Sequence, residues 1–187
     1  MMRKEIRIIG IDDGPFDKFK KGQVLVVGTI YRGGNFLDGF VSTKAKVDGT
    51  NATQKITEMI NKSKFKKQIR AIMLDGIAVG GFNIIDLVEL NKKTKKPVIA
   101  VIRKKPNIPK IKETLKRIGM KNKIKLIEQL KKPEKIGKIY VQYVGINKET
   151  VKELLKITTT HSFLPEPIRA AHIIATGLIK GESKGRA

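Results

Sequence analysis

The sequence contains no cysteine in 187 residues, and no tryptophan. Without cysteine the chain forms no disulfide bond and holds no metal through thiolates. A protein with this composition suits a reducing compartment, and we expect it to be cytoplasmic.

Long apolar runs are also missing. No stretch approaches the roughly 18 apolar residues that a membrane-spanning helix requires. The opening segment MMRKEIRIIG is charged and has an apolar run too short for a signal peptide. We therefore expect a soluble protein with no membrane partner. Its length suits one domain with a sizeable core.

Negative charge is scarce. Seventeen Asp and Glu residues face 40 Lys and Arg residues, which gives a net charge of +23 with His neutral. Such a surface attracts polyanions, and we expect nucleic acid to be a partner. The alternative is a Lys-rich surface that serves solubility in a hot or salt-rich cytosol. An anionic membrane is disfavoured, because no helix pairs a basic face with Trp or Phe anchors.

Aromatic residues make up only 5% of the chain, so platforms on which bases could stack are not evident. Phe16, Phe36 and Phe163, near predicted loops, are weak candidates. The sequence does not indicate an oligomeric state.

The hydrophobic pattern predicts three strands, then alternating helices and strands. β-Branched runs predict strands at 5–11, 23–31 and 36–47, and Arg32-Gly33-Gly34-Asn35 is typical of a hairpin turn. Helical spacing then alternates with short apolar runs. Further helices are predicted at 51–62, 84–93, 108–118, 124–130, 147–156 and 166–179, and further strands at 69–74, 97–102 and 138–144.

Three antiparallel strands followed by βα units predict an α/β fold: a mixed sheet with helices on both faces. This is the element order of the ribonuclease H-like fold. We expect one such domain over residues 1–187, with residues 180–187 forming a mobile tail.

Aspartates follow the predicted strands. Asp12 and Asp13 close the first strand, Asp48 the third and Asp75 the fourth. Sites in open α/β sheets lie outside the carboxyl ends of strands, so we expect these residues to converge and bind Mg²⁺ or Mn²⁺. Two such ions can support phosphodiester cleavage. The alternative is that the Asp-Gly pairs simply form turns.

The chain resembles an archaeal protein family related to endonuclease V, in the ribonuclease H-like superfamily. The resemblance covers nearly the whole length. It rests on the stretches RIIGIDDGPF, VDGTNAT, AIMLDGIAVGGFNIIDL, KPVIAVIRKKPN and LPEPIRAAHIIA. It implies Mg²⁺ ligands at Asp12, Asp48 and Asp75, and a phosphate contact at Arg103 or Lys104.

The chain also departs from endonuclease V. The Tyr-bearing wedge motif of that nuclease is missing, and no His-Pro-Arg follows Asp75-Gly76. The resemblance therefore does not imply recognition of a deaminated base, nor strand cleavage itself. Asp48 stands where the nuclease has Glu, which shortens the reach by one methylene.

Two residues near the C-terminus are possible auxiliary groups. Glu166 and His172 lie on the same face of the predicted last helix, where Arg169 joins them. For His172 we favour packing at the core edge over a role in the site, and for Glu166 the two interpretations stay level. The glycine-containing stretch 76–83 is interpreted as a flexible turn rather than a phosphate-binding loop.

Two functions remain open. The first is a Mg²⁺-dependent nuclease acting on DNA or RNA. The second is a nucleic-acid-binding protein without turnover on a degenerate nuclease scaffold. A third, weaker hypothesis is an enzyme that uses the same cluster on a small molecule.

Overall fold

The computed structural model describes residues 4–183, built around a seven-stranded mixed sheet. The strand order is β3-β2-β1-β4-β7-β9-β8. The strands are β1 (Arg7–Asp13), β2 (Gln23–Arg32), β3 (Phe36–Lys46), β4 (Ala71–Asp75), β7 (Val98–Ile102), β8 (Glu134–Ile136) and β9 (Ile139–Val144). The first three strands pair antiparallel, while β1, β4 and β7 run parallel. This arrangement confirms the predicted mixed sheet.

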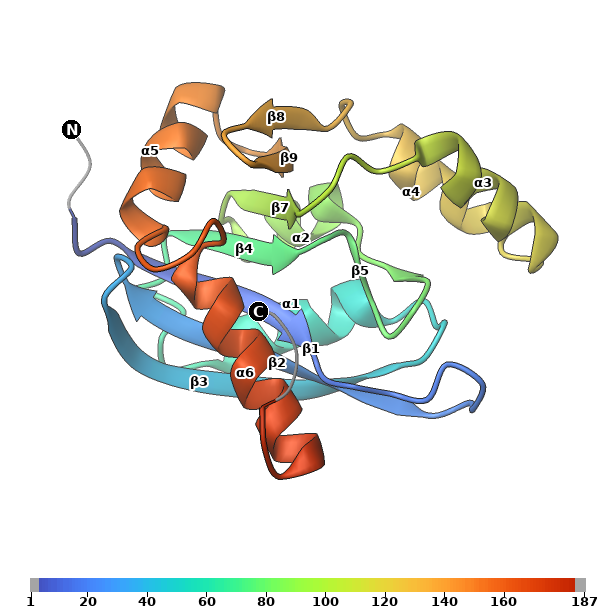
Figure 1. Ribbon diagram of the computed structural model, residues 1–187, viewed down its shortest axis with the longest axis horizontal. Helices are drawn as coiled ribbons and strands as arrows, with labels where there is room; N and C mark the ends of the chain where they lie inside the picture. The colour runs from blue at the N-terminus through green and yellow to red at the C-terminus, as the bar shows by residue number, and fades with distance from the viewer. Residues whose placement is uncertain (1–3, 184–187) are drawn as a thin grey trace.

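Helices cover both faces of the sheet, as predicted (Figure 1). On one face lie α1 (Ala52–Lys62) and α2 (Leu87–Thr94), and on the other α5 (Lys148–Thr158) and α6 (Glu166–Lys180). Helix α3 (Ile108–Arg117), the 3₁₀ turn η1 (Lys121–Lys123) and α4 (Ile124–Glu128) form a projection beyond the end of β7 (Figure 1).

Two hydrophobic clusters separate the layers. One packs Ile9, Ile11 and Leu74 of the sheet against Ile56 of α1 and Leu87 of α2. The other packs the opposite face of the same strands against α5 and α6. The side chains of β1 and β4 alternate between the two clusters, which is why their sequences are continuously apolar rather than alternating.

Gly10 lets α6 cross β1 at close range. A Cβ atom at this position would lie 2.2 Å from the carbonyl carbon of Pro167. The hydroxyl of Thr29, on the neighbouring strand, donates a hydrogen bond of 2.6 Å to the Pro167 carbonyl. The absence of a side chain at Gly10 therefore allows the N-terminal part of α6 to lie directly over the middle of β1.

Three short strands were not predicted from the sequence: β5 (Ala78–Val79) and β6 (Asn83–Ile84), which form a hairpin, and the edge strand β8. Each is two or three residues long, too short for a periodic pattern. The predicted helix at 84–93 begins instead at Leu87, because Asp86 caps it by accepting the Glu89 N–H at 2.9 Å.

Helix α6 ends at Lys180, so only the start of the predicted tail is described, and residues 184–187 lie outside the described residues. Within residues 4–183, every helix is too short or too polar to cross a bilayer.

Candidate active site

Asp12 and Asp75 end neighbouring parallel strands on the same face of the sheet. The register of β1 and β4 pairs Ile11 with Leu74, and each aspartate is the next residue on its strand. Ile11 and Leu74 both face α1 and α2, so alternation directs both carboxylates towards α6. Burial raises the pKa of Asp75, and the negative charge of Asp12 raises it further.

His172 of α6 reaches down to this edge. Its Nδ1 lies 2.9 Å from Oδ2 of Asp12, which is only 6% exposed. The hydrogen bond to Asp12 raises the pKa of His172, against an opposing effect of burial. The other ring nitrogen, Nε2, is buried without a hydrogen-bond partner in the described chain. His172 therefore lies beside the candidate site rather than in apolar packing at the core edge.

Asp13 points to the opposite face. Its Oδ2 accepts the Gly80 N–H at 2.8 Å, on the loop between β5 and β6. Burial raises the pKa of Asp13 to about 6; the Gly80 bond opposes this effect, and the charge of Asp12 adds to it. Asp13 therefore follows Asp12 in the sequence, but its carboxylate binds the loop between β5 and β6.

Asp48 is also directed to that loop. Its Oδ1 accepts the Phe82 N–H at 2.8 Å, and its own N–H donates to the Gly80 carbonyl at 2.8 Å. The residue has a φ of +52°, the left-handed conformation of a tight turn. Gly80 therefore bridges Asp48 and Asp13 through its two backbone groups.

The four predicted aspartates do not surround one point. Among residues 4–183, no three acidic or histidine side chains lie close enough to share a metal ion. In this structure the four aspartates therefore do not form a single cluster. Strand alternation turns Asp13 away from Asp12, and the Phe82 N–H draws Asp48 into the loop. Of the four, Asp12 and Asp75 share one face of the sheet, whereas Asp13 and Asp48 contact the β5–β6 loop.

The predicted phosphate-binding residues differ in position. One guanidinium nitrogen of Arg103 lies 2.9 Å from Oδ2 of Asp75, and this contact lowers the pKa of Asp75 against the larger effect of burial. Lys104 is exposed at the end of β7. Arg103 is therefore tied to a carboxylate of the pair, whereas Lys104 faces solvent.

Glu166 is part of a separate contact. It is 2% exposed and its carboxylate lies 2.8 Å from the Arg169 guanidinium. Its other oxygen accepts the His161 N–H at 3.3 Å. These contacts anchor the first turn of α6 and the segment that precedes it. Glu166 is therefore held in structural contacts with Arg169 and His161. Of the two possible auxiliary residues, His172 is the one that contacts Asp12.

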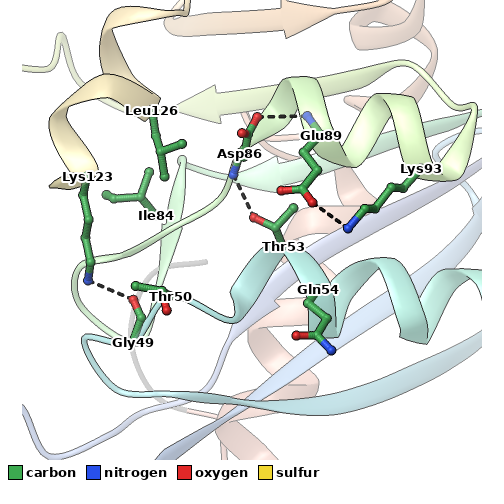
Figure 2. Close-up of a pocket in the computed structure, with 10 residues that line it drawn as sticks. All are labelled: Gly49, Thr50, Thr53, Gln54, Ile84, Asp86, Glu89, Lys93, Lys123 and Leu126. Atoms are coloured by element: carbon green, nitrogen blue, oxygen red, sulfur yellow. Dashed lines mark hydrogen bonds and ion pairs between the residues drawn. The ribbon is translucent and has the colours of Figure 1, made fainter.

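Sequence reasoning missed Lys123, which is only 4% exposed. Its Nζ donates to the carbonyls of Asp48, Gly49 and Phe82 at 2.7, 2.8 and 2.7 Å. Figure 2 shows the Gly49 contact at the end of a cavity of about 270 Å³ on the α1 and α2 side. None of the residues lining this cavity is Asp12, Asp13, Asp75 or His172. The only sequence signal was that Lys123 lies four residues before the buried Ile127.

The donor set at the sheet edge fits a hard divalent cation. Mg²⁺ binds oxygen ligands and keeps several waters when a protein supplies one or two carboxylates. The carboxylates of Asp12 and Asp75 face the same side, and their mutual repulsion is part of what raises the pKa of Asp75. The unpartnered Nε2 of His172 adds a polar atom to the same edge. A cation there would relieve this repulsion.

We expect Asp13→Asn to stabilise the protein in a pH-dependent way. The folded-state pKa is raised from 3.8 to about 6, so the folded protein binds the proton more tightly than the unfolded chain. Ionised Asp13 therefore costs stability that grows as pH rises from about 4 to 6 and persists above. Asparagine can still accept the Gly80 N–H. Calorimetry should show a Tm gain of about 2–5 °C at pH 7.5, and almost none at pH 4. A gain independent of pH would contradict this origin.

Comparisons with a family model, with related sequences and with solved structures agree with one another. A family model described as endonuclease dU matches residues 4–179. A UPF0215 protein from Methanothermobacter thermautotrophicus is 46% identical over 191 aligned residues, covering 100% of this chain and 94% of the relative. A crystal structure of a protein of unknown function from Archaeoglobus fulgidus superposes with a TM-score of 0.85 at 35% identity, covering 92% of this chain and 97% of that one.

Endonuclease V has the same fold. The Ciona intestinalis endonuclease V, solved with a 24mer DNA containing an inosine followed by a ribo-adenosine, superposes with a TM-score of 0.61. The match covers 94% of this chain and 86% of that one at 16% identity. This likeness establishes a ribonuclease H-like fold, in agreement with the strand order.

Proposed function

Since the chain belongs to the endonuclease dU family, we propose that it hydrolyses phosphodiester bonds of nucleic acid with the help of a divalent cation. The observation that carries the proposal is the pair of carboxylates, buried Asp12 and partly buried Asp75, on one face at the carboxyl end of parallel strands. The endonuclease V that shares this fold was solved with DNA, which supports nucleic acid as the substrate class.

Asp12 and Asp75 would hold the cation, which we propose to be Mg²⁺ or Mn²⁺. When bound there, such an ion activates water and stabilises the charge that develops on phosphate oxygens. Asp48 and Asp13 would not contact the cation, because both carboxylates accept backbone N–H groups of the 80–82 loop.

His172 would position Asp12. Its hydrogen bond to Oδ2 fixes the rotamer of that carboxylate, while the Asp13 N–H donates to Oδ1 at 2.8 Å. With both oxygens oriented, Asp12 presents its remaining lone pairs in a fixed direction. Glu166 would serve only to anchor the start of α6, through Arg169.

The positive groups at the end of β7 would bind the substrate backbone. Lys104 is exposed and free to follow a phosphate. Arg103 pairs with Asp75 in this state, and a cation at the carboxylates would weaken that pairing and leave the guanidinium to a phosphate oxygen. The net charge of +23 draws the polyanion to the surface.

One observation favours a second function. The Arg103 guanidinium already neutralises part of the charge that a metal ion would neutralise at Asp75. A chain in which this pair persisted would bind nucleic acid without cleaving it. Such a protein would be indifferent to Mg²⁺ and to removal of the Asp75 charge.

The experiment combines stability and turnover. The Tm is measured with EDTA, Mg²⁺ or Mn²⁺, and end-labelled DNA and RNA, with and without inosine, are then incubated under each condition. A cation that binds the folded state only must raise the Tm by mass action. We expect a rise in Tm and metal-dependent cleavage of at least one substrate. Salt-sensitive binding with no shift and no cleavage would instead support the second function.

A further inference from the structure

A basic groove opens between the β1–β2 loop and the helical projection. It encloses about 600 Å³ and is lined by Lys18–Gln23 of the loop, by Lys46, Val47 and Asp48 after β3, and by Met120 before η1. In Figure 1 the loop and the projection extend beyond the same edge of the sheet, where β4 and β7 end.

Phe19 is the most exposed large apolar side chain among those described. It is 98% exposed at the tip of the loop, whereas Phe16, three residues earlier, packs against the core. An aromatic ring that is fully in water contributes nothing to folding. It is instead suited to stack on a flat partner, and every nucleic-acid base presents such a face.

The groove is strongly positive. Lys18, Lys20, Lys21 and Lys46 line it, and only Lys20 forms an ion pair within the described chain, to Asp17 at 3.7 Å. The one carboxylate in the lining, that of Asp48, is directed to the Phe82 N–H. The walls therefore complement a polyanion.

We propose that this groove binds one single strand of nucleic acid, with Phe19 stacked on a base and the loop lysines on the phosphates. The proposal rests on nucleic acid being the partner named in the proposed function. In Lys18-Phe19-Lys20-Lys21 one aromatic ring stands between lysines, so it can stack on one base while the lysines contact the flanking phosphates. A duplex keeps its bases stacked inside and offers Phe19 no face.

Hydrogen bonds connect the lining of the groove to the strand that carries Asp12. Asp48 lies in its lining and connects through Gly80 to Asp13, which adjoins Asp12. Asp12 and Asp75 face α6, on the other side of the sheet. A strand bound in the groove would therefore reach the pair only by passing over the carboxyl end of β1.

The test measures binding without turnover. Fluorescence anisotropy in EDTA reports the affinity of the full chain for a fluorescein-labelled single-stranded 16mer and for its duplex, at several salt concentrations. The variants are Phe19→Ala, Phe19→Trp and the triple change of Lys18, Lys20 and Lys21 to Gln. The matched control changes Lys62, Lys66 and Lys67 to Gln; these exposed lysines lie near the opposite edge, before β4.

We expect the single strand to bind more tightly than the duplex. Phe19→Ala should weaken single-strand binding about tenfold, and Phe19→Trp should preserve it. The loop triple should reduce the slope of log K against log salt by about 2, since each lost phosphate contact contributes about 0.7. The control triple should leave the slope unchanged. All these side chains are exposed, so the Tm should stay constant.

Two results would contradict the proposal that the groove binds a single strand. One is wild-type affinity in Phe19→Ala, and the other is an equal loss of slope in the loop and control triples, which would indicate diffuse charge alone. Neither depends on cleavage. If binding behaves as expected but the chain shows no nuclease activity, the proposed hydrolysis is contradicted and the proposed binding in the groove is supported.

Discussion

Asp75→Asn should abolish metal-dependent cleavage and at the same time raise the stability of the protein. We expect the cleavage rate to fall by a factor of at least about 10³, because the cation would lose one of its two carboxylates. We expect the Tm without metal to rise by about 2–5 °C. Activity assays and calorimetry on the same preparation measure both effects.

The two effects have one cause. The pKa of Asp75 is raised because the carboxylate is buried beside Asp12. Since the folded-state pKa lies above the unfolded value, the ionised group costs stability at neutral pH. Asparagine removes the charge, keeps the size and can still accept a hydrogen bond from Arg103. A site that binds a cation is destabilised without it, so removing the charge benefits the metal-free fold and harms function.

A control separates this effect from net charge. Glu149→Gln removes one negative charge from the exposed first turn of α5, away from the carboxylate pair. It should leave cleavage and the metal-induced rise in Tm intact, whereas Asp75→Asn should lose both. Asp12→Asn should also lose cleavage while remaining folded. Unfolding of either aspartate variant would show that its carboxylate is structural, and undiminished cleavage would show that cleavage does not depend on the pair.

Lys123→Met should lower the free energy of unfolding by about 3 kcal/mol. Methionine matches the length of the side chain but leaves the carbonyls of Asp48, Gly49 and Phe82 without their donor. Each buried group left unsatisfied costs about 1–3 kcal/mol, and removal of the buried ammonium offsets part of this. For a chain of this size the Tm should fall by about 6–12 °C.

The control is Lys121→Met, two residues away and exposed. It should change the Tm by less than about 2 °C. In Lys123→Met, hydrogen exchange should accelerate at the Phe82 amide, because that amide depends on the position of Asp48. Equal Tm values for the two variants would mean that the buried ammonium contributes no net stability.

Much of the architecture could be predicted from local pattern. Apart from Asp12, the buried residues of the runs RIIGIDD, AIMLD and VIAVI are apolar, and buried parallel strands require this. The consecutive glycines Gly33 and Gly34 marked the turn between β2 and β3. With the strand order implied by the β-β-β-α-β-α-β series, Asp12 and Asp75 could be expected on one edge, because adjacent parallel strands end together.

The tertiary structure decided which of the other polar residues joined that pair. Asp13 and Asp48 are indistinguishable from Asp12 by residue type, yet backbone N–H groups of Gly80 and Phe82 draw them away. Gly80 and Phe82 are more than 30 residues away in the sequence from the aspartates they contact. The direction of their N–H groups depends on the β5–β6 hairpin, whose two-residue strands leave no periodic signal. His172 reaches Asp12 only because Gly10 admits α6 so closely. Sequence determines which segments are buried and in what order they pair, since burial is set by local periodicity. Which hydrogen bonds a carboxylate accepts depends on loops from distant parts of the chain, and only the folded structure brings those loops together.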